Sequence, residues 1–77
     1  MKLINGEMIV LEDGNEYIVI NTTNINGIEY ALLMTSTKPV SMMVVMTEVE
    51  RDESISVTTV SDQEVIKEVV SNITNAN

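Results

Sequence analysis

The residues of this sequence that could carry out chemistry are mainly carboxylates, because the chain has twelve Asp and Glu residues but no His and no Cys. Without His, no Ser or Thr hydroxyl has the usual general base beside it, and without Cys there is no thiolate nucleophile. Most of the acids fall in predicted turns or beside a predicted helix, where they support local structure. We therefore predict no catalytic residues and a protein that is not an enzyme.

One acidic segment, 12–16, has the composition of a calcium-binding loop, with oxygen ligands around Gly14. It lacks the alternating ligand spacing and the distant bidentate Glu of an EF-hand loop, and a hairpin turn of this sequence needs no metal. The three glycines, Gly6, Gly14 and Gly27, are too isolated for a phosphate-binding loop. We therefore expect no metal site and no cofactor.

Length and charge restrict the class of protein. The 77 residues are enough for a single domain, 1–77, whose small core leaves a thin margin of stability. The formal net charge of −8 repels nucleic acid and anionic lipid, so we expect neither as a direct ligand. No stretch approaches the roughly 18 apolar residues of a membrane span. Because Glu7 comes too early for a secretory signal, we expect a cytoplasmic protein.

The elements that must position these residues are mostly strands, since the apolar residues are mainly Val, Ile, Leu and Met. Asp13-Gly14 and Asn26-Gly27 each join two such runs and predict hairpins, because these dipeptides supply the positive φ angles of tight turns. Pro39 lacks the N–H that a central strand needs, so it belongs in the next loop or at the first residue of a strand. The predicted strands are 7–12, 17–22, 28–35, 41–49 and 54–60.

The last part of the chain changes to a helical period and predicts a helix over 62–73. Ser61 and Glu64 fit a capping box, with the Ser61 hydroxyl bonding the Glu64 amide. The apolar residues fall within one arc of the helix, so we expect it to be amphipathic; they are Val65, Ile66, Val69, Val70 and Ile73. The predicted fold class is α+β and mostly β: about five antiparallel strands in a meander, then one C-terminal amphipathic helix.

Most predicted strands are apolar on both faces, although one helix covers only one face of a sheet. Either the sheet rolls into a barrel-like shape, or a second copy or a partner packs on it; we favour the second alternative. Methionine is common on adaptable binding surfaces, and the segment 42–46 is rich in it. The candidate apolar interface is Met42, Met43, Val45 and Met46, and the other interpretation of this segment is a buried strand.

In segments 11–17, 26–33, 49–53 and 62–69, a D-G-x-E hairpin precedes an x-G-x-E-Y-x-L-L strand, an acidic turn and an acidic helix. With these motifs the sequence resembles the YrzB-like family of short acidic proteins of Bacillus-type bacteria. The chain differs in being less acidic and Met-rich in its middle. A phage-encoded relative is a further alternative. The family has no established activity, so the resemblance implies a fold only.

Two functions remain open. The first is a non-enzymatic, homo-oligomeric interaction protein that binds another protein, with a basic partner as one expectation. The alternative is an acidic nucleic-acid mimic that inhibits a nuclease, polymerase or defence complex by occupying its basic groove. The candidate acidic surface consists of Glu12, Asp13, Glu16, Glu50, Asp52, Glu53, Asp62, Glu64 and Glu68.

Overall fold

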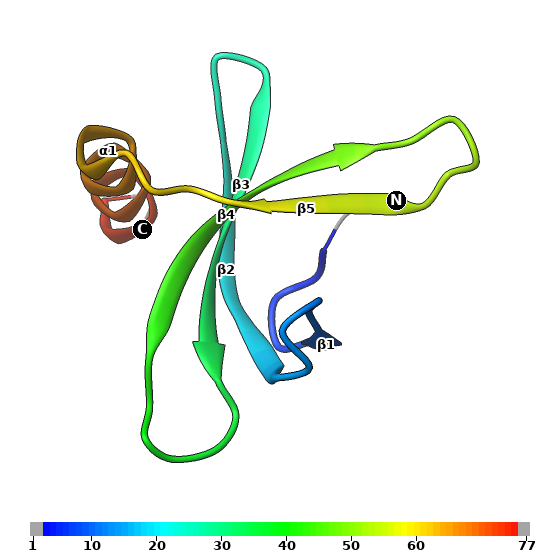
Figure 1. Cartoon of the computed structure of the whole chain (residues 1–77). Coiled ribbons are helices and arrows are strands. Elements are labelled where there is room, and N and C mark those ends of the chain that lie inside the picture. The colour runs from blue at the N-terminus through cyan, green and yellow to red at the C-terminus, as the bar shows by residue number, and fades with distance from the viewer. Residues whose placement is uncertain (1–2, 76–77) are drawn as a thin grey trace.

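The computed structural model describes residues 3–75, and its strands lie side by side in the order of the sequence. Each neighbouring pair is antiparallel, so the sheet is a meander, and a helix follows the last strand (Figure 1). The predicted mostly β fold with a C-terminal helix is confirmed. The elements are β1 (Met8–Val10), β2 (Glu16–Ile25), β3 (Ile28–Thr35), β4 (Met42–Val49), β5 (Ile55–Thr59) and α1 (Gln63–Thr74).

The β2–β3 hairpin turns at Asn26 and Gly27, as the Asn-Gly pair predicts. Their φ angles are 54° and 83°, which is the left-handed region that a two-residue hairpin turn requires. The β1–β2 connection uses its dipeptide differently. Only Gly14 has a positive φ there, 81°, and its N–H donates to the Leu11 carbonyl at 2.9 Å. The expectation that Asp13 also supplies a positive φ is therefore wrong.

The β4–β5 turn repeats this geometry with a glutamate in the position of the glycine. The Glu53 N–H donates to the Glu50 carbonyl at 3.0 Å, and Glu53 has a φ of 70°. A left-handed conformation costs a residue with a side chain about 1–2 kcal/mol, whereas glycine adopts it freely. The chain therefore keeps a carboxylate at the tip of this turn at some cost in stability.

Two strands differ from their predicted bounds by more than one residue at an end. β1 is shorter because Leu11 already belongs to the turn, and β2 continues to Ile25 although its second half is polar. The continuation includes a bulge at Ile20, since Val19 pairs with Leu33 but Asn21 pairs with Leu32. An inserted residue bends a strand and increases its twist, which helps a sheet to curl.

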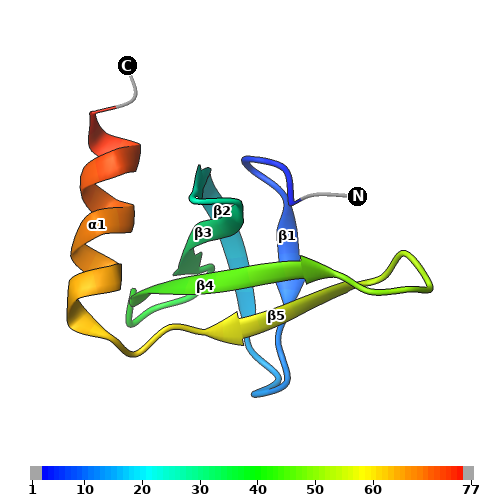
Figure 2. The same ribbon diagram turned by 90° about the horizontal axis from the view of Figure 1, so that it is seen from above.

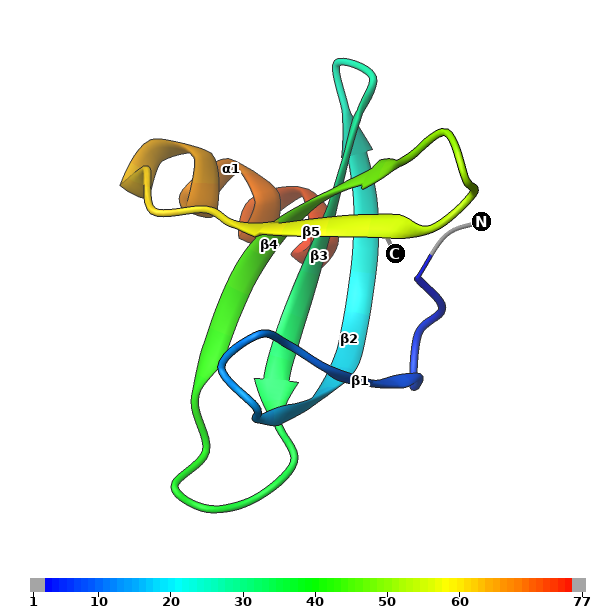
Figure 3. The same ribbon diagram turned by 45° about the vertical axis from the view of Figure 1, so that its right-hand side comes forward.

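The sheet is rolled, which decides between the two ways of covering its second face. β4 pairs with β3 from Met42 to Thr47 and with β5 from Val45 to Val49, and it curves along its length so that β5 crosses over the sheet (Figures 1 and 3). The concave side encloses the larger apolar cluster, so the rolled alternative is the one observed for this face, and association with a second copy or a partner stays a prediction. The buried members of this interior cluster are Leu3, Tyr17, Val19, Ala31, Leu33 and Val45, with Ile9, Leu11, Met43, Ile55 and Val57 packed against them.

The helix α1 covers part of the outer, convex face (Figure 2). Its Val69 is fully buried and forms a second cluster with Tyr30 and Val44. A hydrogen bond from the Thr23 hydroxyl to the Asn72 side-chain oxygen ties the end of the helix to β2. The outer face is therefore covered over only part of its area, and the remainder lies at the end of the sheet where β1 and the first half of β4 are found.

The helix begins one residue later than its predicted cap. Asp62, not Ser61, is the N-cap residue, and its carboxylate accepts a hydrogen bond from the Glu64 N–H at 2.9 Å. Asp62 has extended backbone angles, φ −71° and ψ 116°, as N-cap residues do. The capping box centred on Ser61 is wrong because the extended chain after β5 reaches one residue further than the sequence pattern suggests.

Candidate functional site

The structure separates the four residues of the predicted apolar interface, because alternate residues of a strand point to opposite faces. Val45 is fully buried in the interior cluster, and Met43 packs against the same cluster. Met46 points outward but packs in the cluster beneath α1. Only Met42 is open to solvent, with 55% of its surface exposed. The segment 42–46 is therefore mainly a core strand, with one accessible methionine.

Met42 ends a row of apolar side chains that crosses four strands on the outer face. Met8 is paired with Ile18, Ile18 with Met34, and Met34 with Met42. Directly opposed residues in antiparallel strands lie on the same face, with Cβ atoms about 5 Å apart. Met8 and Met42 are more than half exposed, and the two residues between them are half-buried. We call these four residues the methionine row.

An apolar groove continues this surface toward the helix. It has a volume of about 320 Å³, and all of its lining residues are apolar. The helix contributes the half-buried Ile66 and the exposed Val70, while β4 supplies the opposite wall. We call this hollow the β4–α1 groove; it is lined by Leu32, Met42, Met43, Val44, Val60, Ile66 and Val70.

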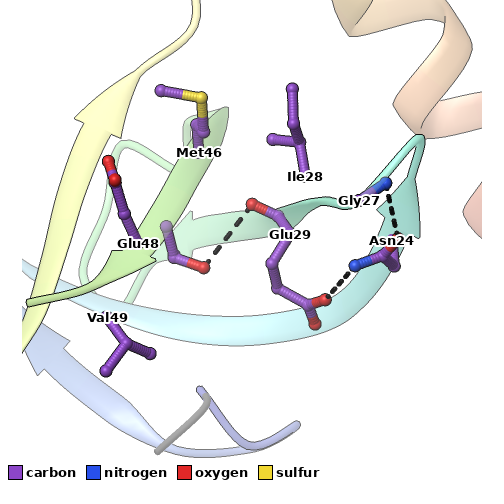
Figure 4. Close-up of a pocket in the computed structure, with 8 residues that line it drawn as sticks. Asn24, Gly27, Ile28, Glu29, Met46, Glu48 and Val49 are labelled. Carbon is purple, nitrogen blue, oxygen red and sulfur yellow. Dashed lines mark hydrogen bonds between the residues drawn. The ribbon is translucent and has the colours of Figure 1, made fainter. Parts of the chain in front are cut away.

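A larger hollow of about 430 Å³ lies at the β2–β3 hairpin (Figure 4). Its polar groups bond mainly to one another: the Asn24 amide donates to Glu29 Oε1 at 3.2 Å, and the Gly27 N–H donates to Asn24 Oδ1 at 3.1 Å. The side chains of Glu29 and Glu48 point in opposite directions, so the two carboxylates do not form a pair (Figure 4). The polar groups of this hollow thus hold the hairpin turn in shape.

All nine residues of the candidate acidic surface are exposed, but they lie in three separate regions. The regions are the β1–β2 connection, the β4–β5 turn and the helix, which project in different directions (Figures 1 and 2). Three of these acids accept hydrogen bonds from residues close in the sequence, and Glu16 accepts one from the Ser36 hydroxyl. Besides Asp62 at the helix cap, Asp13 accepts from the Asn15 N–H, and Asp52 accepts from the N–H and hydroxyl of Ser54.

Asp13 also accepts a hydrogen bond from a buried tyrosine. The ring of Tyr17 is buried, and its hydroxyl donates to Asp13 Oδ2 at 2.7 Å. This hydrogen bond, followed by that from the Asn15 N–H, lowers the pKa of Asp13 below its usual value. The same contact raises the pKa of Tyr17. The pair therefore fastens the β1–β2 connection to the rolled sheet and does not leave a carboxylate poised for proton transfer.

The lowered pKa of Asp13 predicts that its contact with Tyr17 is lost in acid. Because the pKa of Asp13 is lower in the folded protein, its stabilising contribution is present above roughly pH 4 and is lost as the pH falls through the lowered pKa. We expect Tyr17→Phe to lose less stability than the parent on acidification, measured by thermal unfolding at several pH values. Carbon NMR titration should show a higher pKa for Asp13 in the variant. Asp52, which Ser54 holds, serves as the unchanged control, and an unaltered Asp13 titration would contradict the assignment.

Within residues 3–75, no group of three or more Asp and Glu side chains is placed to hold a metal ion. The helix described in this range is too short and too polar to cross a membrane. Sequence reasoning missed Met8 and Met34 as surface partners of Met42, because only strand register brings the three together. A repeated methionine at strand ends was the only available signal.

Comparisons of the chain with protein-family models, with curated proteins and with solved structures give no match. The resemblance to the YrzB-like family therefore stays a prediction.

Proposed function

We propose that this protein is a non-enzymatic protein-binding domain whose binding surface is the outer face of the sheet beside α1. The observation that carries the proposal is the continuity of the methionine row with the β4–α1 groove, which leaves apolar side chains from four strands and the helix accessible. Contiguous exposed apolar surface is uncommon on small monomeric proteins and marks interaction sites. Methionine side chains adapt to the shape of a partner.

Self-association is the second candidate, but the rolled sheet leaves less apolar surface for it than the sequence suggests. The second apolar face, which a homo-oligomer was expected to cover, is enclosed by the rolled sheet itself. What remains is the outer face, where Met42 and Met8 are the most exposed members of the methionine row. Sedimentation across a range of protein concentrations distinguishes a monomer from a homo-oligomer.

The test is capture of a partner from bacterial lysate by the tagged protein, with identification by mass spectrometry at low and high salt. An apolar contact should survive roughly 1 M salt, where charges more than about 3 Å apart are screened. Met42→Lys should abolish capture, because it places a charge in the apolar surface. The matched control is Val49→Lys, since Val49 has a similar exposure, 53% against 55% for Met42, and lies at the other end of β4.

Two results would overturn the proposal. In the first, Met42→Lys captures the same partner as the parent while circular dichroism shows both to be folded. In the second, capture occurs only at low salt and is lost when acids of the β4–β5 turn are changed to Gln; this result would favour the nucleic-acid mimic. Met43 and Met46 are unsuitable test positions, because both pack in apolar clusters and their replacement would unfold the domain.

A further inference from the structure

The start of β4 has a free backbone edge at Met42. β5 pairs with β4 only from Val45 to Val49, and one further bond runs from the Val60 N–H to the Val44 carbonyl at 2.9 Å. On the other side, the Thr35 N–H of β3 donates to the Ser41 carbonyl at 2.9 Å. Successive residues of a strand direct their backbone groups to opposite sides. The N–H and carbonyl of Met42 therefore face away from β3, at the edge where β5 has already ended.

This edge and the β4–α1 groove are parts of one surface. Met42 and Val44 line the groove with their side chains, and α1 forms the far wall with Ile66 and Val70. A strand added beside Met42 would direct alternate side chains to the outer face, where the groove lies. Strand addition of this kind takes its affinity from backbone hydrogen bonds and its specificity from such a pocket.

The available area and the charge favour a peptide segment over a second copy. A standard interface buries about 800 Å² on each partner, which takes roughly 20–30 residues. The groove offers far fewer accessible side chains: Val70 is 39% exposed, Met42 is 55% exposed, and the other lining residues are less exposed. A second copy would also bring its own charge of −8 to the contact. An extended segment needs less area because its backbone pairs with the edge, and flanking Lys or Arg side chains would be attracted by this charge.

We propose that the open edge of β4 at Met42 and the β4–α1 groove together bind an extended segment of a partner protein, in which apolar residues alternate with basic ones. The inference rests on the proposed function and makes it specific. The apolar side chains of the segment enter the groove, its backbone pairs with Met42, and the net charge of −8 attracts its basic side chains.

The probe is a synthetic eight-residue peptide of alternating Val and Lys, titrated into the full chain and followed through the backbone amide signals by NMR. Two matched peptides accompany it: one carries N-methyl groups on the amides that would pair with β4, and one has Glu in place of Lys. The protein variants are Val70→Lys in the groove and Val10→Lys on β1. Val10 is 67% exposed and lies outside the groove, so this control carries the same charge change.

We expect the Val–Lys peptide to shift the amide signals of 42–44, 66 and 70, with at least about tenfold weaker binding for the N-methylated peptide and for Val70→Lys. Val10→Lys should stay within about twofold of the parent. Equal binding of the N-methylated peptide would overturn the backbone pairing, and equal binding of the Glu peptide would overturn the basic segment. Concentration-dependent shifts of the same signals without peptide would assign the groove to a second copy.

The peptide titration and the capture test have different negative results, so the two proposals can be told apart. If Met42→Lys loses a captured partner but the Val–Lys peptide does not bind at 42–44, the outer face binds protein and only the strand-addition inference is wrong. If Met42→Lys captures the partner as the parent does, the proposed function itself is wrong.

Discussion

Leu33→Ala is expected to lower the free energy of unfolding by about 2–5 kcal/mol, the range for removing a large aliphatic side chain from a packed core. Leu33 is fully buried on β3 at the centre of the interior cluster, between Val19 of β2 and Met43 of β4. The total stability of a domain this small is of the same order as the loss. Urea unfolding followed by circular dichroism measures the change.

The control for this variant is Met8→Ala, which removes a comparable amount of side chain from a position that is 53% exposed. We expect its effect on the free energy of unfolding to stay within about 0.5 kcal/mol. A loss below about 1 kcal/mol for Leu33→Ala would contradict a close-packed interior in the rolled sheet. A second face covered by another copy or by a partner, the alternative favoured from the sequence, would then need to be considered again.

Val69→Asp is expected to release the helix from the sheet. Val69 is fully buried against Tyr30 and Val44, so the new carboxylate would be desolvated without a partner, at a cost above roughly 4 kcal/mol. A helix of twelve residues rich in Val and Ile has little stability alone. We expect the backbone amides of α1 to lose their protection from hydrogen exchange.

The adjacent residue provides the matched control. Val70 is 39% exposed in the wall of the β4–α1 groove, so Val70→Asp adds the same charge without burying it. We expect Val70→Asp to keep the helix protected, with a change in stability of about 0.5 kcal/mol or less. If both variants keep the protection of α1, the helix does not depend on the contact that Val69 makes. Neighbouring valines thus separate a role in folding from a role in binding.

Much of the fold follows from local sequence signals. The Asn26-Gly27 pair requires a tight hairpin because both residues accept a positive φ, and β3 has the predicted bounds 28–35. The change from strand to helical period places α1 within one residue of its prediction. These features depend on a few neighbouring residues, so the chain specifies them without reference to the rest of the molecule.

The bounds of β2 and the helix cap could not be read in this way. The polar residues Asn21 to Asn24 have the composition of a loop, but they lie in a strand because β3 pairs with them past the bulge at Ile20. Asp62 is the cap in place of Ser61, and because Asp and Ser are both favoured N-cap residues, local preference does not choose between them. For β2, a partner far along the chain overrides local preference.

The sequence by itself determined the order and type of the elements, the positions of the glycine turns and the abundance of apolar strand residues. Only the tertiary structure decided which of these residues are accessible. Val45 and Met42 are three positions apart in one strand, yet the roll of the sheet buries the first and leaves the second on the outer face. The methionine row exists because strand register aligns residues from four strands, and register and curvature arise from pairing between distant segments.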